Sequence, residues 1–210
     1  MAIATGPDTA PTPRRRRSPQ QARHEILDAA AALLAQSPSH DVTVSAIMSR
    51  TTLSRKSFYV YFRDRADLLA SLLAPLRAQT DAAVERWRAA PEMIQSGRAA
   101  LRDAAFLYHR HGAILRALVA ASQHDADAAE VWRTFIEPVI TVAAEKIAEA
   151  TGPEADTGLD PQATARALVG MNVHYFIERL VGAPASEIDP TVTTLTAIWE
   201  RTLFLRPPRP

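Results

Sequence analysis

The apolar residues of this chain recur every three or four positions over most of its length, which is the spacing of amphipathic helices. The first such run predicts a helix over residues 18–36. Ser18 stands at the N-cap, Pro19 at the first helical position and Gln21 at the third, a combination typical of a helix start. The apolar face of this helix consists of Ile26, Leu27, Ala30, Leu33 and Leu34.

Two short helices follow, over residues 44–48 and 55–62. The first carries one apolar stripe behind the cap residue Thr43, and Ser54 caps the second. Thr51–Leu53 interrupt the pattern and form a turn between them. In the second helix Phe58 and Phe62 stand four positions apart and face the core. This leaves Arg55, Lys56, Ser57, Tyr59 and Tyr61 on the outside, where they suit contacts with phosphates and base edges.

A fourth, long helix begins at Asp64 and Asp67, whose carboxylates suit the free amides and the dipole of a helix start. It continues as far as Trp87. Pro75 falls in its middle and removes a backbone hydrogen bond, so we expect a kink near residues 71–75, either a static bend or a hinge.

Helical patterns continue to the end of the chain. They predict helices over residues 92–109, around 114–119 after a break at Gly112, over 125–150 with a kink at Pro138, over 161–181 and over 190–205. Asp160-Pro161 and Asp189-Pro190 each place a cap residue before a helix-starting proline. No strand-like alternation is present, so the predicted fold class is all-α, with about nine helices.

Composition divides the chain into a basic head and an acidic body. Residues 1–65 hold ten Lys and Arg against five Asp and Glu, whereas the remaining residues hold fourteen against eighteen. Residues 1–17 are rich in Pro and Thr, end in four arginines, and are expected to form a disordered basic arm. The chain has no cysteine, no apolar run of membrane-spanning length and no apparent signal peptide. We therefore expect a soluble, cytoplasmic protein whose basic end faces a polyanion.

The sequence offers little for catalysis. It lacks a glycine-rich phosphate loop, a nucleophile elbow and paired metal-ligand motifs. His109 and His111 are two positions apart and point to different faces of a helix, which makes a poor metal site. We therefore expect no enzyme, no metal and no cofactor.

One stretch carries a resemblance to a known family. The spacing of Ile47, Leu53, Ser54, Phe58-Tyr59, Tyr61-Phe62, Asp64-Arg65 and Leu68-Leu69 resembles the helix-turn-helix signature of the TetR-type bacterial transcriptional repressors. That family usually has Ala-Gly in the turn, where this chain has Thr51-Thr52. A left-handed turn position strains a β-branched residue, so either the turn geometry differs here or some stability is lost.

The resemblance implies a DNA-binding domain over residues 18–65 and a ligand-binding and dimerisation domain over residues 66–210. The expected base contacts come from Arg55, Lys56 and Ser57, and the expected phosphate contacts from Thr43, Tyr59, Tyr61 and Arg65. The arginine run, Arg14, Arg15, Arg16 and Arg17, is either a solvated tail or a source of further phosphate and minor-groove contacts.

Within the family, the segments AEVWRTFIEPVI, GMNVHYF and AIWERTLF are similar to the ethionamide-resistance type of mycobacterial repressor. The resemblance to the TetR-type repressors implies that the helices at 161–181 and 190–205 pair with those of a second subunit as a four-helix bundle, and that the helices between enclose a small-molecule pocket. The pocket candidates are Trp87, Phe106, Tyr108, Trp132, Phe135, Asn172, Tyr175, Phe176 and Trp199, with Asn172 as the polar anchor. Core packing is the alternative for the aromatic residues, and a hydrogen bond to the preceding helical turn is the alternative for Asn172.

The expectation is a ligand-responsive repressor that binds a palindromic double-stranded DNA operator as a homodimer and is released by a small hydrophobic effector. A ligand-independent regulator or activator is the alternative within DNA binding. A helical interaction protein is the alternative from another class.

Overall fold

The computed structural model describes residues 18–36, 42–91, 93–151 and 160–204 of the 210-residue chain. The described residues form eight α-helices and one 3-10 helix, without a β-strand. They are α1 (Pro19–Gln36), α2 (Val44–Met48), α3 (Arg55–Tyr61), α4 (Arg65–Ala89), α5 (Met93–Ser122), α6 (Ala126–Thr151), α7 (Pro161–Leu180), η2 (Ala185–Glu187) and α8 (Ile188–Phe204). The predicted all-α fold class is confirmed.

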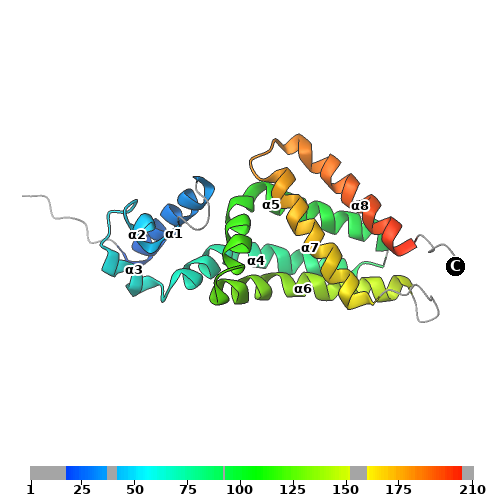
Figure 1. Ribbon diagram of the computed structural model, residues 1–210, viewed down its shortest axis with the longest axis horizontal. Coiled ribbons are helices and arrows are strands. Elements are labelled where there is room, and N and C mark those ends of the chain that lie inside the picture. The colour runs from blue at the N-terminus through cyan, green and yellow to red at the C-terminus, as the bar shows by residue number, and fades with distance from the viewer. Residues whose placement is uncertain (1–17, 37–41, 92, 152–159, 205–210) are drawn as a thin grey trace, which may run out of the picture.

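Helices α1 to α3 lie together at one end of the molecule, and α4 extends from them into a larger group formed with α5 to α8 (Figure 1). Helices α1 to α3, here called the small group, pack around Ile26, Ile47, Phe58 and Phe62, which are almost completely buried. The spacing of Phe58 and Phe62 over one helical turn therefore directs the opposite side of α3 away from the protein.

The predicted N-caps of four helices are confirmed, that of α2 at Thr43. At α1, Ser18 Oγ accepts from the amide of Gln21, and the Gln21 side chain accepts in return from the amide of Ser18. At α4, Asp64 accepts from the amide of Asp67, and at α7, Asp160 accepts from the amide of Gln162. These bonds satisfy amides that have no partner within the helix.

Two predicted boundaries are wrong. Gly112 does not separate two helices, because α5 is continuous from Met93 to Ser122. A Cβ at Gly112 would lie 2.5 Å from Cγ2 of Val181, so this glycine permits close packing of α5 against the end of α7. Helix α8 begins at Ile188 rather than after Asp189, and the Asp189 carboxylate instead forms an ion pair of 2.9 Å with Arg102 of α5.

Helix α4 connects the two parts of the chain. It is helical throughout, with Pro75 inside it and exposed to solvent. On the side of the small group, Arg23 of α1 donates a hydrogen bond of 2.7 Å to Oγ of Ser71, and its guanidinium lies 5.0 Å from the centre of the Phe62 ring. Arg23 therefore ties α1 to α4 within one turn of the proline. None of the helices in the described ranges could span a membrane.

Candidate nucleic-acid interface and effector cavity

Side-chain hydrogen bonds stabilise the turn between α2 and α3, which contains no glycine. No residue other than glycine has a positive φ in the described part of the chain, so Thr51 and Thr52 are not strained. Thr51 Oγ1 donates to the carbonyl of Met48 and accepts from the amide of Leu53. The Glu25 carboxylate on α1 accepts from both the amide and the hydroxyl of Thr52, at 2.6 and 2.8 Å. Of the two explanations for the missing glycine, the structure supports a different turn geometry.

The outer surface of α3 collects most of the residues predicted to bind DNA. Arg55, Lys56 and Tyr59 are exposed, and 57% of the Tyr59 side chain remains accessible. Ser57 is half-buried, and its hydroxyl shares a hydrogen bond with that of Ser54, with the two oxygens 3.0 Å apart. Ser54 occupies the N-cap position of α3 but makes no capping bond to the backbone, contrary to the expectation from sequence.

The residues predicted to contact phosphate surround this surface. Thr43 is exposed at the start of α2, where its Oγ1 accepts from the amide of Ala46. Its hydroxyl proton remains available for a phosphate oxygen. Tyr61 and Arg65 are half-buried, at the end of α3 and the start of α4. The run from Arg14 to Arg17 lies outside the described residues.

One exposed residue of α3 was not among the sequence candidates. Val60 exposes 75% of its side chain, more than any other large apolar residue in the described part of the chain. The sequence held the signal for this exposure, because Val60 stands midway between the inward-facing Phe58 and Phe62. It was not predicted to contact DNA because its side chain has neither a charge nor a hydrogen-bonding group.

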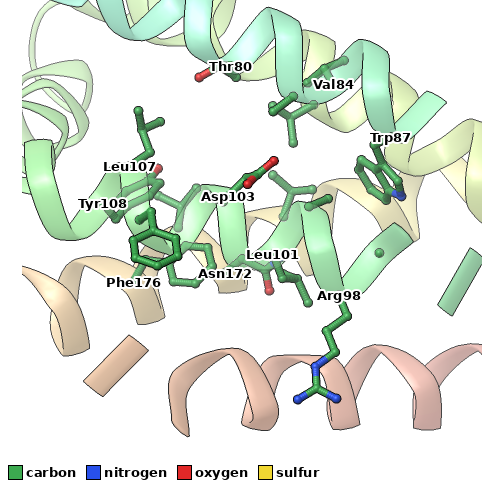
Figure 2. Close-up of a pocket in the computed structure, with 18 of the residues that line it drawn as sticks. Thr80, Val84, Trp87, Arg98, Leu101, Asp103, Leu107, Tyr108, Asn172 and Phe176 are labelled. Atoms are coloured by element: carbon green, nitrogen blue, oxygen red, sulfur yellow. The ribbon is translucent and has the colours of Figure 1, made fainter. Parts of the chain in front are cut away.

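A cavity of about 450 Å³ lies among α4, α5, α6, α7 and α8. Figure 2 shows Thr80, Val84 and Trp87 of α4 on one side, with Leu101, Leu107 and Tyr108 of α5 and Asn172 and Phe176 of α7 on the other. Seven of the nine pocket candidates line it, namely Trp87, Phe106, Tyr108, Phe135, Asn172, Phe176 and Trp199. The volume lies within the range of ligand sites in proteins.

Asn172 is the best-defined polar group of the cavity wall. Its side chain is only 7% exposed, and its Oδ1 accepts from Nε1 of Trp199 on α8 at 3.2 Å. The alternative bond, from the amide nitrogen to the preceding helical turn, is absent among the described residues. The bond from Trp199 fixes the orientation of the amide. The amide nitrogen has no hydrogen-bond partner within the described residues, so the group can offer a donor to a ligand.

Aromatic pairs hold the wall around Asn172. The ring of Trp199 meets that of Trp87 edge-on, with centroids 6.4 Å apart, and Tyr108 packs against Phe176 at 5.3 Å. Burial raises the pKa of the Tyr108 hydroxyl well above its usual value, so the group stays protonated. Within the described residues, neither the Tyr108 oxygen nor Nε1 of Trp87 has a hydrogen-bond partner.

Most of the charged residues that line the cavity are exposed to solvent. Arg86 of α4 and Asp103 of α5, both exposed, form an ion pair of 2.7 Å that bridges the two helices. Arg98, Arg110 and Glu200 are the remaining ionic lining residues, and the two arginines are exposed. These positions were not predicted from the sequence because their charges are typical of solvated helix faces.

Trp132 and Tyr175 do not line this cavity. Trp132 stacks on Phe135 with centroids 5.8 Å apart, but its ring faces a separate depression of about 250 Å³ between α6 and α7. An ion pair of 3.0 Å between Glu137 and Arg166 lies at the rim of that depression. Tyr175 is half-buried against the core on another side of α7. Helix periodicity places all nine candidates on helices but does not resolve which way these two side chains face.

One face of α7 points away from the other described helices. Gly170 and His174 are exposed one turn apart, Met171 and Ile177 are half-buried, and a Cβ at Gly170 would meet no atom within 4 Å. The opposite face of the same helix, with Leu168, Val169, Val173 and Phe176, packs in the core.

Two protein-family models match the chain. The model described as bacterial regulatory proteins of the tetR family matches residues 26–72, and the model described as the C-terminal domain of the transcriptional regulator EthR matches residues 97–204. The HTH-type transcriptional regulator EthR of Mycobacterium tuberculosis is 28% identical over 184 residues, which cover 85% of each chain. EthR of Mycolicibacterium smegmatis is 26% identical over 210 residues, covering 92% of this chain and 93% of the relative.

Solved structures share the fold. The fatty acid degradation regulator FadR from Bacillus halodurans superimposes with a TM-score of 0.68 at 14% identity, covering 91% of this chain and 99% of that one. FadR from Bacillus subtilis, solved in complex with stearoyl-CoA, gives a TM-score of 0.60 at 16% identity, covering 86% and 97%.

Proposed function

This chain belongs to the TetR family of bacterial regulatory proteins, with a C-terminal domain of the EthR type, and we propose that it is a repressor released from its operator by a small, largely apolar effector. Members of this family regulate transcription through a DNA-binding helix-turn-helix, and the chain is accordingly a transcriptional regulator and not an enzyme. The finer parts of the proposal concern the DNA contacts, the dimer and the effector.

In the proposal, the protein acts in the cytoplasm. Residues 18–65 form its DNA-binding domain. Arg55, Lys56 and Ser57 reach base edges, while Tyr59 and the residues around it contact phosphates. The exposure of two cations and a phenol on one short helix supports this assignment, because such groups recognise both parts of a duplex. Residues 1–17 would add charge that strengthens binding without reading sequence.

Residues 66–210 act as the effector-binding and dimerisation domain in the proposal. The outward face of α7, with Gly170 at its centre, would pair with the same face of a second subunit, and α8 would complete a four-helix bundle. The free space above Gly170 supports this pairing, because a helix can approach closely where no side chain intervenes. Such a dimer would place its two α3 helices in successive major grooves, about 34 Å apart.

The effector site is supported above all by the cavity beside Asn172. An apolar wall with one oriented amide donor fits a ligand that is mainly hydrocarbon and carries a hydrogen-bond acceptor, such as a carbonyl oxygen. Four of the charged lining residues are exposed and Glu200 is half-buried, so a ligand charge held beside the buried Asn172 would be costly. Among proteins of this fold, FadR from Bacillus subtilis was solved with stearoyl-CoA, which contains a long hydrocarbon chain.

Release would pass through α4, which contributes Val84 and Trp87 to the cavity and Asp64 to the end beside α3. A ligand that fills the cavity would shift α4 and change the separation of the two α3 helices. The free energy of this coupling equals the difference between the ligand's binding free energies for two states, the DNA-bound state and the state in which the α3 helices have moved apart.

The test combines thermal shift with operator binding. A library of apolar compounds with and without a carbonyl group is screened for stabilisation of the full chain, and each stabilising compound is titrated against the protein bound to DNA from its own upstream region. We expect carbonyl-containing compounds to stabilise the protein and to lower its affinity for the operator.

Two variants make the test specific to the cavity. Ala104→Trp places an indole among the lining residues, whereas Ala99→Trp places the same group at an exposed, non-lining position of the same helix. The first variant is expected to bind the operator but lose the response, and the second to behave like the wild type. A library without a single stabilising compound, or release that persists unchanged in Ala104→Trp, would reject the effector site.

A further inference from the structure

Val60 on α3 is an apolar side chain placed where the proposed DNA contacts are made. Single exposed apolar residues are common on protein surfaces and by themselves carry no meaning. The position of Val60 is unusual because its neighbours on the same exposed surface, Arg55, Lys56 and Tyr59, are all polar. At 75% exposure its side chain contributes almost nothing to the core of the small group.

Helix geometry places Val60 at the centre of the outward face. Each residue of an α-helix turns by about 100°, so Val60 lies about 200° from Phe58, and Phe62 follows the helix as its C-cap residue. Those two rings are buried at 0% and 2% exposure and define the inward direction. Val60 therefore points almost directly away from the core. Lys56, one turn earlier, shares this direction.

Local stability does not explain the choice of valine. A β-branched residue loses rotamer freedom in a helix, so alanine, lysine or glutamine would favour α3 more at an exposed position. The alkyl group also offers nothing to a phosphate, because it has neither charge nor a hydrogen-bond donor. What it can contact favourably is another apolar group.

The major groove of DNA presents one such group, the C5-methyl of thymine. We propose that Val60 reads a thymine methyl in each operator half-site. The seven residues of α3 span about 10 Å, and Val60 lies about 7.5 Å along the axis from Arg55, a distance of roughly two base-pair steps. We therefore expect the thymine to lie close to the base pairs that Arg55 and Lys56 are proposed to contact. This inference rests on the proposed use of α3 as the recognition helix.

The experiment removes the methyl group from the DNA. The full chain first selects its operator from random duplexes, and each thymidine in one half-site is then replaced singly by deoxyuridine, which lacks only the C5-methyl group. Affinities are measured by fluorescence anisotropy at one salt concentration for the wild type, Val60→Ala and Lys56→Ala. Val60→Ala removes the proposed partner, and Lys56→Ala serves as a matched control on the same face.

For the wild type, we expect one deoxyuridine position at which affinity falls about threefold to fivefold, the size of a buried methyl contact. In Val60→Ala that position should tolerate deoxyuridine without loss, whereas Lys56→Ala should bind more weakly overall and keep the sensitivity. A sensitivity that persists in Val60→Ala, or a wild type indifferent to every methyl, overturns the reading by Val60. A wild type that selects no duplex overturns the recognition helix as well, so the two failures are distinguishable.

Discussion

The bonds from Glu25 to Thr52 make the helix-turn-helix of this chain depend on a residue of α1. The Glu25 carboxylate accepts two hydrogen bonds from Thr52, at 2.6 and 2.8 Å, in the turn that orients α3. Glu25→Ala removes the single carboxylate oxygen that accepts both bonds and leaves the core of the small group intact. We therefore expect the variant to fold with a loosened turn.

The magnitude follows from the kind of bond lost. A hydrogen bond to a charged group contributes about 1.5–3 kcal/mol, and water replaces part of this at a site as exposed as Thr52. We expect the two bonds together to lower the free energy of unfolding by about 2 kcal/mol. For a protein of this size that loss corresponds to a decrease in Tm of about 4–8 °C. Glu25→Gln keeps a neutral acceptor, so it should lose about half as much.

Chemical denaturation and operator titration measure the two consequences. Asp28→Ala is the matched control, because Asp28 is exposed, lies three residues later on α1, and has no hydrogen bond or ion pair within the described structure. Both variants remove one negative charge near the DNA, so any electrostatic gain in affinity is common to them. Glu25→Ala should be less stable and bind the operator more weakly than Asp28→Ala. Equal stability and equal affinity of the two variants would refute the assignment of the turn to Glu25.

Three further predictions concern the body. Gly170→Gln should leave the chain folded, because a Cβ at this position meets no atom within 4 Å. The variant should sediment as a monomer in analytical ultracentrifugation, whereas the control Gly170→Ala should remain a dimer. A stable dimer of Gly170→Gln would place the interface elsewhere. Trp199→Phe should lower the free energy of unfolding by about 1–2 kcal/mol, measured by thermal unfolding, because the buried Asn172 oxygen loses its donor. Trp87→Phe should cost less, because the N–H of Trp87 has no partner within the described structure. Equal losses in the two variants would contradict the role of the bond to Asn172. Ser71→Ala removes the acceptor of the hydrogen bond from α1 and should reduce the effect of an effector on operator affinity; an unchanged effect would mean that this bond carries no coupling.

The sequence was most informative where local chemistry determines structure. The cap residues Ser18, Asp64 and Asp160 can be recognised from three or four neighbouring residues, because a cap bonds to an amide within its own turn. Period and spacing likewise located the inward faces of α1 and α3. Both kinds of signal concern contacts between residues close in the sequence.

Contacts distant in the sequence were harder to predict. The turn at Thr52 depends on Glu25, 27 residues earlier, and Gly112 is explained by Val181 at the end of α7. In each case the local rule pointed to strain or a break, whereas the partner from another helix explains the residue. The same limit applies to Trp132, because a helical wheel does not say which neighbouring helix an aromatic side chain will meet.

Effector and operator are proposed to oppose each other's binding to one protein, and thermodynamic linkage measures this opposition. The effector's Kd is measured for the free chain and for the chain saturated with operator, and the operator's Kd is measured with and without saturating effector. Both ratios should agree, with a factor of about 5–150, whereas in Ala104→Trp the operator's Kd should be the same with and without effector. An effector that occupies the cavity with the same Kd in the presence and absence of operator would contradict the account.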